Sequence, residues 1–312
     1  MNPRRGADHG KFGATGFLNL ARRLHLLTST QLQEPDSMNW LVVTDLDGTL
    51  LDATYPVAQA AAAIDAIAGG RRGVPVVLAS SKTLSEMVSI AGRCESNPVL
   101  LFENGAGMAW REPALGSRGT FEHAGFQVEC TAVPYADICA RLELLRRDRA
   151  YQFRGFADMT SAELAALTGF ELAAAEAAQR RMASEPIEWC GDDESLQRFR
   201  QELADMGLCL ERGGVFRHVT GNINKQRALL CLINRMRYQT GVRFTTLACG
   251  DAPNDLAMLK AADNALVFPH VDGGYLLPEG DGVRHAPKAG PATWLAYVSQ
   301  VIESAGVEAL TI

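Results

Sequence analysis

Two aspartates, Asp45 and Asp47, follow an apolar segment and are the first residues of the sequence that point to chemistry. The segment WLVVT, residues 40–44, has the apolar, β-branched composition of a strand that is covered on both faces. Side chains two residues apart on an extended chain point the same way, so both carboxylates can approach one spot. Two close anions are costly unless a cation lies between them or one of them takes a proton. The pair therefore predicts a cation-binding or acid–base site.

Four further polar residues stand at the boundaries of expected elements. Asp251 ends the apolar segment FTTLACGD, and Asp255 follows where a helix is expected to begin. Ser80 ends the apolar segment VVLAS, and Lys225 opens the helical stretch KQRALLCLINRMRYQTG. Carboxylates at the end of a strand suit a hard cation with oxygen ligands, such as Mg²⁺. A hydroxyl beside the backbone N–H groups of a helix N-terminus suits an anion.

An alternation of strands and helices must position these residues. Short connections between strand and helix predict a parallel sheet with right-handed crossovers. Ligands bind such a sheet at the carboxyl ends of its strands, which is where the polar residues stand. Strands are expected within 40–46, 73–80, 98–106, 244–251 and 264–269, and helices within 57–70, 82–94, 225–241, 254–262 and 291–305.

The pattern predicts an α/β fold, a doubly wound parallel sheet, with an α+β domain inserted into it. The sheet and its helices are expected to come from residues 38–110 and 220–312. Residues 111–219 differ, with alanine-rich helical stretches and two strand-like segments, and are expected to form a small domain that caps the sheet. Residues 1–37 are arginine-containing, glycine-rich and only weakly periodic, which indicates a flexible extension ahead of a fold that begins at Met38.

Composition narrows the class of protein. The chain has 312 residues, enough for one large or two ordinary domains, and 47% of them are hydrophobic. A net charge of −6 argues against nucleic acid as the main partner, because binding to phosphate backbones needs basic surface. No apolar run is long enough to span a bilayer, and the seven cysteines show no regular spacing. We therefore expect a cytoplasmic protein without a membrane partner, and the oligomeric state stays open.

The order of these motifs resembles that of the haloacid dehalogenase superfamily of phosphatases. DLDGTLLD, the strand-end serine, the lysine and GDAPND occur in the sequence order of that superfamily. Further segments, SSKT, ENGA and GFADMT, are similar to those of its mannosyl-3-phosphoglycerate phosphatase family. The similarity runs from about Met38 nearly to the C-terminus. It implies a haloacid dehalogenase-like core with an α/β cap.

The resemblance implies a role for each residue of the site. Asp45 would be the nucleophile and Asp47 the general acid and base, while Ser80 and Lys225 would hold the phosphoryl oxygens. The turn that shapes the site would contain Gly48 and Thr49. Mg²⁺ would be bound by Asp45, the carbonyl group of Asp47, Asp251, Asn254 and Asp255.

The family substrate, 2-O-mannosyl-3-phosphoglycerate, carries a carboxylate as well as a phosphate, so basic residues are expected beyond the phosphate site. Lys82 is the first candidate. The other candidates for substrate contacts are Ser81, Glu103, Asn104, Arg212, Arg217 and His218, and Asp158 is expected either to contact the sugar or to cap the helix that starts near Thr160.

Several functions stay open at this point. The product of the family reaction is mannosylglycerate, a compatible solute. A related ester, such as glucosyl-3-phosphoglycerate or another sugar phosphate, is the alternative substrate within the same chemistry. A non-catalytic sensor of phosphosugars and a phosphomutase are the alternatives from other classes. The complete set of Asp45, Asp47, Ser80, Lys225 and Asp251 argues against the sensor.

Overall fold

The structure is a computed structural model that describes most of the chain after residue 38. It describes residues 39–51, 57–112, 114–116, 118–212, 216–270, 272–276, 278 and 280–308. The predicted extension 1–37 and the predicted start of the fold at Met38 lie outside these residues. Among the described helices, none combines the length and the apolar character that crossing a bilayer requires.

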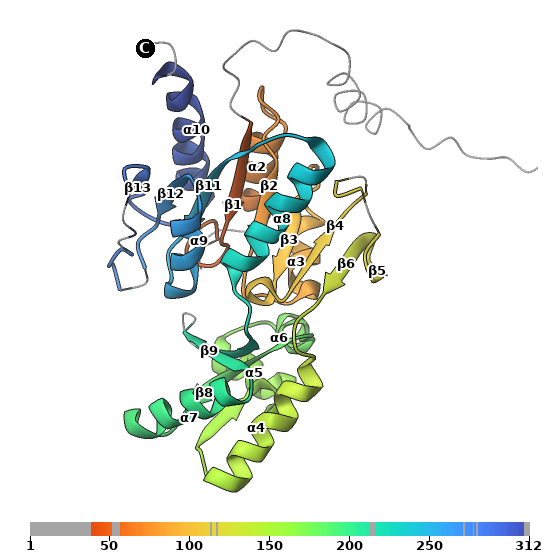
Figure 1. The fold of residues 1–312 in the computed structure, drawn as a ribbon, viewed down its shortest axis with the longest axis vertical. Helices are drawn as coiled ribbons and strands as arrows, with labels where there is room; N and C mark the ends of the chain where they lie inside the picture. The colour runs from red at the N-terminus through yellow and green to blue at the C-terminus, as the bar shows by residue number, and fades with distance from the viewer. Residues whose placement is uncertain are drawn as a thin grey trace, which may run out of the picture. The chain divides into compact units, whose positions relative to one another are not determined.

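A nine-stranded sheet is the larger of two sheets in the structure (Figure 1). Its strand order is β13-β12-β11-β1-β2-β3-β4-β6-β5, and neighbouring strands from β13 to β3 pair in parallel. The strands span Trp40–Thr44 (β1), Val76–Ala79 (β2), Val99–Phe102 (β3), Gly107–Trp110 (β4), Phe121–His123 (β5), Phe126–Cys130 (β6), Thr245–Gly250 (β11), Asn264–Val267 (β12) and Val283–His285 (β13). The parallel part places the carboxyl ends of β1, β2, β3, β11 and β12 along one edge.

Helices cover both faces of this sheet, as its uninterrupted apolar strands require. Alternate residues of β1 enter the two cores: Val42 packs with α2, α3 and α10, and Val43 packs with α8 and α9. These helices span Val57–Ala68 (α2), Leu84–Ala91 (α3), Lys225–Thr240 (α8), Leu256–Ala261 (α9) and Pro291–Glu308 (α10). Two of them start at side-chain caps beside the site: Thr83 and Glu86 form a capping box for α3, and Asn224 caps α8.

A four-stranded antiparallel sheet, with order β7-β8-β10-β9, forms a second layered region (Figure 1). Its elements are α4 (Tyr135–Arg149), β7 (Phe153–Gly155), α5 (Ser161–Thr168), α6 (Leu172–Gln179), β8 (Ser184–Trp189), α7 (Asp193–Asp205), β9 (Leu208–Arg212) and β10 (Arg217–Gly221). Short 3₁₀ turns are formed by Glu103–Gly105 (η2), Phe156–Asp158 (η3) and Pro253–Asp255 (η4). We refer to the region from α4 to β10 as the cap.

The register of β9 and β10 decides which cap side chains face which way. Val219 and Leu210 are cross-strand partners, and both pack in the cluster that α4 and α7 cover. The neighbouring partners His218 and Glu211 therefore share the opposite face of the sheet, because side chains alternate along a strand. Arg217 lies on the same face as Val219.

The sheet pairing differs from the predicted domain limits at one place. Strands β5 and β6, residues 121–130, fall within the segment 111–219 that the sequence assigns to the cap, yet they pair antiparallel onto β4 in the nine-stranded sheet. A hairpin can extend a sheet edge without a crossover, so it carries no strand–helix signal of the kind used for the prediction. The division into 38–110, 111–219 and 220–312 otherwise stays a prediction.

Candidate active site

Asp45, Lys225 and Asp255 form a buried ion cluster at the carboxyl edge of the nine-stranded sheet. The Lys225 ammonium group donates to Asp45 Oδ1 at 2.5 Å and to Asp255 Oδ1 at 2.6 Å. Lys225 is the first residue of α8, directly after the Asn224 cap, so the start of the helix determines where the Lys225 side chain reaches the two carboxylates. The other oxygen of Asp255 accepts from the backbone N–H groups of Asp251 and Ala252. The sequence predicted that these residues meet, and they do.

The charges of this cluster perturb one another. Burial raises the pKa of Asp45 well above its usual value, and the nearby carboxylates of Asp255 and Asp251 raise it further, against the attraction of Lys225. Burial opposes the charge of Lys225, but Asp255 and Asp45 outweigh it, so the pKa of Lys225 is raised. One ammonium group therefore lies among more carboxylate charge than it can neutralise.

Asp251 is held at the other side of the cluster. Its Oδ1 accepts from the Thr49 hydroxyl at 3.0 Å, and its Oδ2 lies 3.4 Å from His270 Nδ1. Burial, with Asp255 adding to it, raises the pKa of Asp251 to about 6. Gly48 has φ +81°, and a Cβ there would lie 2.4 Å from Asp251 Oδ2, so only glycine allows this close approach.

The residues at this edge fit a divalent cation. Ligand oxygens of Asp45, Asp251 and Asp255 lie within 4.8 Å of one another, and all three residues are buried. Together with Lys225 they carry a formal charge of −2, which a divalent cation would neutralise. Among the described residues, the buried Oδ1 of Asn254 has no hydrogen-bond partner, which leaves a further oxygen ligand available. An all-oxygen donor set of this kind is typical of Mg²⁺.

The loops after β1 and β2 are joined by an ion pair between Asp47 and Lys82. The Lys82 ammonium group lies 2.9 Å from Asp47 Oδ2 and 4.0 Å from Glu86. Burial opposes the charge of Lys82, but Asp47 and Glu86 outweigh it and raise its pKa. Asp47 keeps 58% of its side chain exposed, whereas Ser80 is buried and its hydroxyl oxygen accepts from the Lys82 backbone N–H group. Lys82, which we expected to bind the carboxylate of the substrate, is therefore already paired with the carboxylate of Asp47.

Glu103 directly follows β3, as the sequence predicted, but it makes contacts that the sequence did not predict. Its carboxylate is fully buried and accepts from Met182 N at 2.8 Å, Ala183 N at 3.0 Å and the Ser184 hydroxyl at 2.7 Å. Arg181 lies 3.8 Å from the same carboxylate and donates to the carbonyl oxygen of Ser81 at 2.8 Å. Glu103 thus ties the core to the cap, and its predicted contact with sugar hydroxyls has no support in this geometry.

Replacing Glu103 with Ala is expected to lower the free energy of unfolding by about 3 kcal/mol. The change leaves three hydrogen-bond donors and the buried charge of Arg181 without their partner. Chemical denaturation followed by circular dichroism measures the change. Glu112→Ala, at an exposed glutamate, is the control and should change stability by less than about 0.5 kcal/mol. An equal effect of both changes would contradict the assigned contact.

Asn104 and Asn254 meet where η2 and η4 approach each other. Asn254 Nδ2 donates to Asn104 Oδ1 at 3.1 Å, while the buried Nδ2 of Asn104 has no partner among the described residues. Asn104 has φ +57° and Glu103 has φ +49°, two consecutive left-handed residues that most side chains disfavour. These backbone conformations direct the polar side chains of Glu103 and Asn104 from the turn that follows β3. The predicted substrate contact of Asn104 stays a prediction.

The basic cap residues separate into two groups. His218 is buried on the sheet face opposite the α4 and α7 cluster, and both Arg181 and Lys225 influence its charge. Arg217 lies on the face of α7 instead, where burial, Arg212 and Arg200 lower its pKa. The register therefore turns Arg217 away from the face that carries His218, and its predicted substrate contact has no support.

Asp158, on η3, has a structural position. Its carboxylate accepts from Gly155 N at 2.7 Å and binds Arg146, while Thr160 caps α5 with its own side chain. The predicted role of Asp158 as the cap of that helix is wrong, because Thr160 and Glu163 form its capping box. The predicted sugar contact of Asp158 stays a prediction.

Two residues at the site were missed from the sequence. His270 follows β12, the strand that pairs with β11. The principle that ligands bind at the carboxyl ends of parallel strands, applied to β12 as well, would have found it. Glu211 is the cross-strand partner of His218, and only the β9–β10 register reveals that pairing.

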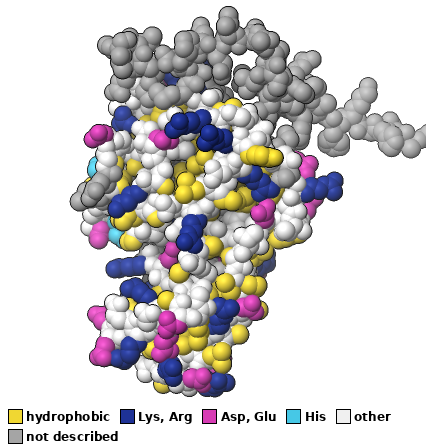
Figure 2. Space-filling view, viewed as in Figure 1, with side chains coloured by type: hydrophobic (Ala, Val, Ile, Leu, Met, Phe, Trp, Pro, Cys, Tyr) yellow, Lys and Arg dark blue, Asp and Glu magenta, His cyan; other side chains and the backbone are white. Residues whose placement is uncertain are grey.

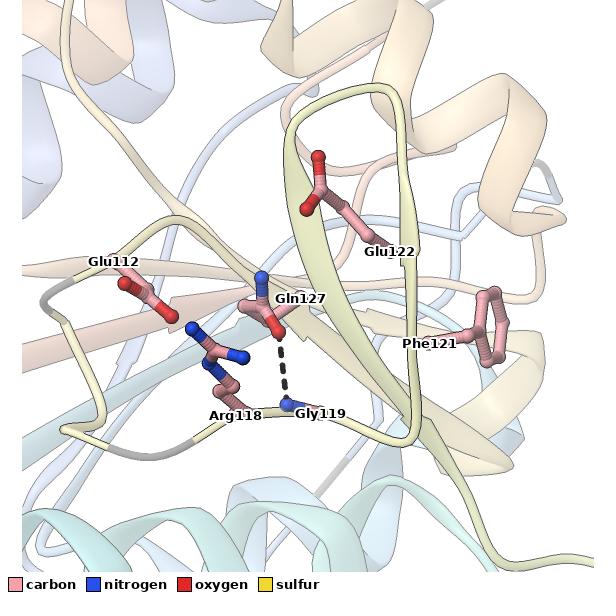
Figure 3. A pocket seen from close by; sticks show the side chains of 6 residues that line it. All are labelled: Glu112, Arg118, Gly119, Phe121, Glu122 and Gln127. Atoms are coloured by element: carbon pink, nitrogen blue, oxygen red, sulfur yellow. Dashed lines mark hydrogen bonds between the residues drawn. The ribbon is translucent and has the colours of Figure 1, made fainter.

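A cavity of about 390 Å³ lies elsewhere, at the loop and hairpin that lead into β5 and β6 (Figure 3). It is lined by Glu112, Arg118, Gly119, Phe121, Glu122 and Gln127. Figure 3 shows Phe121 pointing away from Arg118, and the amide oxygen of Gln127 accepts from Gly119 N at 3.1 Å. The cavity contains none of the predicted site residues.

A curated protein is similar to this chain over most of its length. The chain is 28% identical over 272 residues to a glucosyl-3-phosphoglycerate/mannosyl-3-phosphoglycerate phosphatase of Methanococcoides burtonii, covering 85% of this chain and 98% of that protein. No protein-family model matches the chain.

Solved structures share the fold. A phosphatase of the haloalkanoate (HAD) enzyme superfamily from Bacteroides thetaiotaomicron has a TM-score of 0.59 at 17% identity, with 88% of this chain and 99% of that chain covered. A haloacid dehalogenase-like hydrolase from the same organism has a TM-score of 0.55 at 19% identity, with 85% and 98% covered. These likenesses confirm the predicted fold class, and the curated relative confirms the resemblance found in the sequence motifs.

Proposed function

We propose that this chain, a phosphoric monoester hydrolase with the haloacid dehalogenase-like fold, hydrolyses 2-O-mannosyl-3-phosphoglycerate to mannosylglycerate and phosphate. The observation that carries the proposal is the cluster of Asp45, Lys225, Asp251 and Asp255 in a chain that is similar to a phosphatase of this ester. The same relative is named for the glucosyl ester, which makes glucosyl-3-phosphoglycerate the second candidate substrate.

In the proposed first step, Asp45 attacks phosphorus. One of its oxygens accepts from Lys225, which fixes the orientation of the carboxylate. A new bond forms between Asp45 and phosphorus while the bond from phosphorus to the glycerate oxygen breaks, giving an aspartyl-phosphate. Asp47 gives its proton to the departing oxygen, so the leaving group departs as an alcohol.

In the second step, water regenerates Asp45. Asp47, now ionised, takes a proton from the water, whose oxygen bonds to phosphorus as the aspartyl–phosphorus bond breaks. The exposed position of Asp47 and its ion pair with Lys82 support this role, since the carboxylate can reach a leaving group while Lys82 fixes its direction. Lys82 is then a positioning residue for Asp47.

Phosphoryl oxygens would be held by Ser80 and Lys225. Both are buried at the carboxyl edge of the sheet, where their hydrogen bonds are stronger than in water. Asp45, Asp251, Asp255 and Asn254 would hold Mg²⁺, which when bound supplies charge neutralisation between the carboxylate and the phosphate.

The affinity for Mg²⁺ is expected to rise with pH. The pKa of Asp251, raised to about 6 by burial and by Asp255, means that this ligand is protonated below pH 6 and ionised above it. A cation must displace that proton, so affinity should fall up to about tenfold for each pH unit below 6. Calorimetric titration of the metal-free protein between pH 5 and 8, in buffers of different ionisation enthalpy, measures both affinity and released protons. Binding that is independent of pH, without proton release, would contradict the prediction.

Phosphate release from a panel of esters tests the function. The mannosyl and glucosyl esters, mannose 6-phosphate and 3-phosphoglycerate are compared by kcat/KM with and without Mg²⁺. We expect the mannosyl ester to be preferred, with turnover lost on metal removal. Preference for another ester would replace the proposed substrate. Transfer of phosphate to a second sugar hydroxyl would identify a mutase, and binding without turnover would identify a sensor.

Charge on the surface is consistent with a small-molecule substrate. In the view of Figure 2, basic and acidic side chains are interspersed over the face that is seen, rather than gathered by sign. Binding to a nucleic-acid backbone would need a basic stripe or patch.

A further inference from the structure

Glu211 and His218 form a pair on the cap face that lies toward the ion cluster. They are cross-strand partners of β9 and β10, on the face opposite Leu210 and Val219. Glu211 lines a cavity together with Asn224 and Asn254 of the core, which places this face of the cap sheet toward the candidate active site.

Both side chains carry a buried polar atom that is not satisfied. Oε2 of Glu211 and Nδ1 of His218 have no hydrogen-bond partner among the residues that the structure describes. His218 is only 8% exposed. An unpaired buried donor or acceptor costs about 1–3 kcal/mol, a cost that a bound partner removes. Two such atoms on cross-strand partner residues indicate a place built for a polar ligand.

A small cavity lies beside Glu211. It has a volume of about 170 Å³, and its lining comes from both the cap and the core: Glu211, Arg212, Asn224, Pro253, Asn254 and Ala257. Asn254 and Asn224 belong to the loops that carry Asp255 and Lys225. The cavity therefore places Glu211 of the cap next to the loops that carry Lys225 and Asp255 of the ion cluster.

The pair matches hydroxyl groups rather than charged ones. Burial, Arg181 and Lys225 lower the pKa of His218 to about 3, so its imidazole is neutral. Burial raises the pKa of Glu211 to about 7 despite the attraction of Lys225, so the carboxyl group carries only part of a charge near neutral pH. A hydroxyl group both donates and accepts, and it can satisfy a carboxyl oxygen and a neutral imidazole nitrogen together.

We propose that Glu211 is a specificity-determining residue whose Oε2, together with Nδ1 of its cross-strand partner His218, binds hydroxyl groups of the sugar in the leaving group. The inference rests on the proposed function, which supplies the sugar. It adds a cap residue that discriminates esters with a glycosyl group from esters without one, because removal of the sugar leaves both buried atoms unpaired.

Substitution of Glu211 tests the inference. For Glu211→Ala and Glu211→Gln, kcat/KM is measured with the mannosyl and glucosyl esters and with 3-phosphoglycerate and p-nitrophenyl phosphate, which lack the sugar. We expect Glu211→Ala to lower kcat/KM for the better glycosyl ester about 10- to 100-fold more than for the esters without sugar, mainly through KM. Glu211→Gln, which keeps one acceptor oxygen and the shape, should show a smaller loss in the same direction.

A matched control is Glu188→Ala, at an exposed glutamate on the same face of the cap sheet. It should leave the ratio between the two kinds of ester unchanged. Melting temperatures show whether Glu211→Ala has a folding defect. If it has one, the kcat/KM ratio between the two kinds of ester in Glu211→Gln is the deciding measurement. An equal loss on all esters, or no loss on any, would overturn the inference and leave the proposed function intact. Failure of the wild-type protein to hydrolyse either glycosyl ester would overturn both.

Discussion

Asp45→Asn is expected to lower kcat for phosphate release by about 10⁴-fold or more, because an amide cannot form the aspartyl-phosphate. The fold should persist, since Lys225 keeps its 2.6 Å contact with Asp255 and the change removes one carboxylate from a cluster with excess negative charge. Steady-state phosphate release with saturating Mg²⁺ measures kcat, and circular dichroism with thermal melting confirms the fold.

Asp137→Asn is the matched control for this change. Asp137 is an exposed aspartate in the first turn of α4, and its replacement should keep kcat within about twofold, as expected for surface changes. Magnesium-dependent turnover that survives Asp45→Asn would remove Asp45 as the nucleophile. If the wild-type protein has no such turnover, the sensor becomes the better hypothesis.

Lys225→Met is expected to affect stability as well as catalysis. Lys225 is 1% exposed and bridges two buried carboxylates, so its loss leaves Asp45 and Asp255 facing each other without a cation. Removing one partner of a buried ion cluster typically costs about 3–5 kcal/mol. The phosphoryl group also loses a charged donor, which should lower kcat by about 10²- to 10³-fold. Urea denaturation and phosphate release measure the two effects.

The metal distinguishes this explanation from a simple packing defect. Added Mg²⁺ should raise the melting temperature of the Lys225→Met variant more than that of the wild-type protein, because a divalent cation replaces part of the lost positive charge. Lys260→Met, at an exposed lysine of α9, serves as the control and should melt within a few degrees of the wild-type protein. A Lys225→Met variant that keeps wild-type stability would contradict the buried cluster.

Much of the fold could be predicted because its signals are local. The apolar strands β1, β2, β3, β11 and β12 alternate with helices, and strand–helix alternation has few topological solutions. The edge hairpin β5–β6 escaped this reasoning because its three-residue edge strand has no buried residue. The residues at the ends of the parallel strands were found for the same topological reason, and the carboxylates of Asp45, Asp251 and Asp255, which could hold a metal ion, lie together where the sequence predicted.

The cap contacts could not be predicted, because a strand's sequence does not state which face lies toward the site. Arg217 and His218 are adjacent and both polar, yet the pairing of β10 with β8 and β9 turns them to opposite faces. Glu103 likewise reads as a strand-end acid, and only its contact with residues 182–184 shows that it joins the cap to the core.

The sequence by itself determined the parallel strands of the larger sheet, the polar residues at their carboxyl ends and therefore the meeting of Asp45, Lys225, Asp251 and Asp255. These follow from periodicity and from chain topology, which act over short stretches. Tertiary structure alone decided that Lys82 pairs with Asp47, that Glu103 joins the cap to the core and that Glu211 lies beside His218. Each of these depends on the register or the packing of segments far apart in the chain, and no local pattern encodes either.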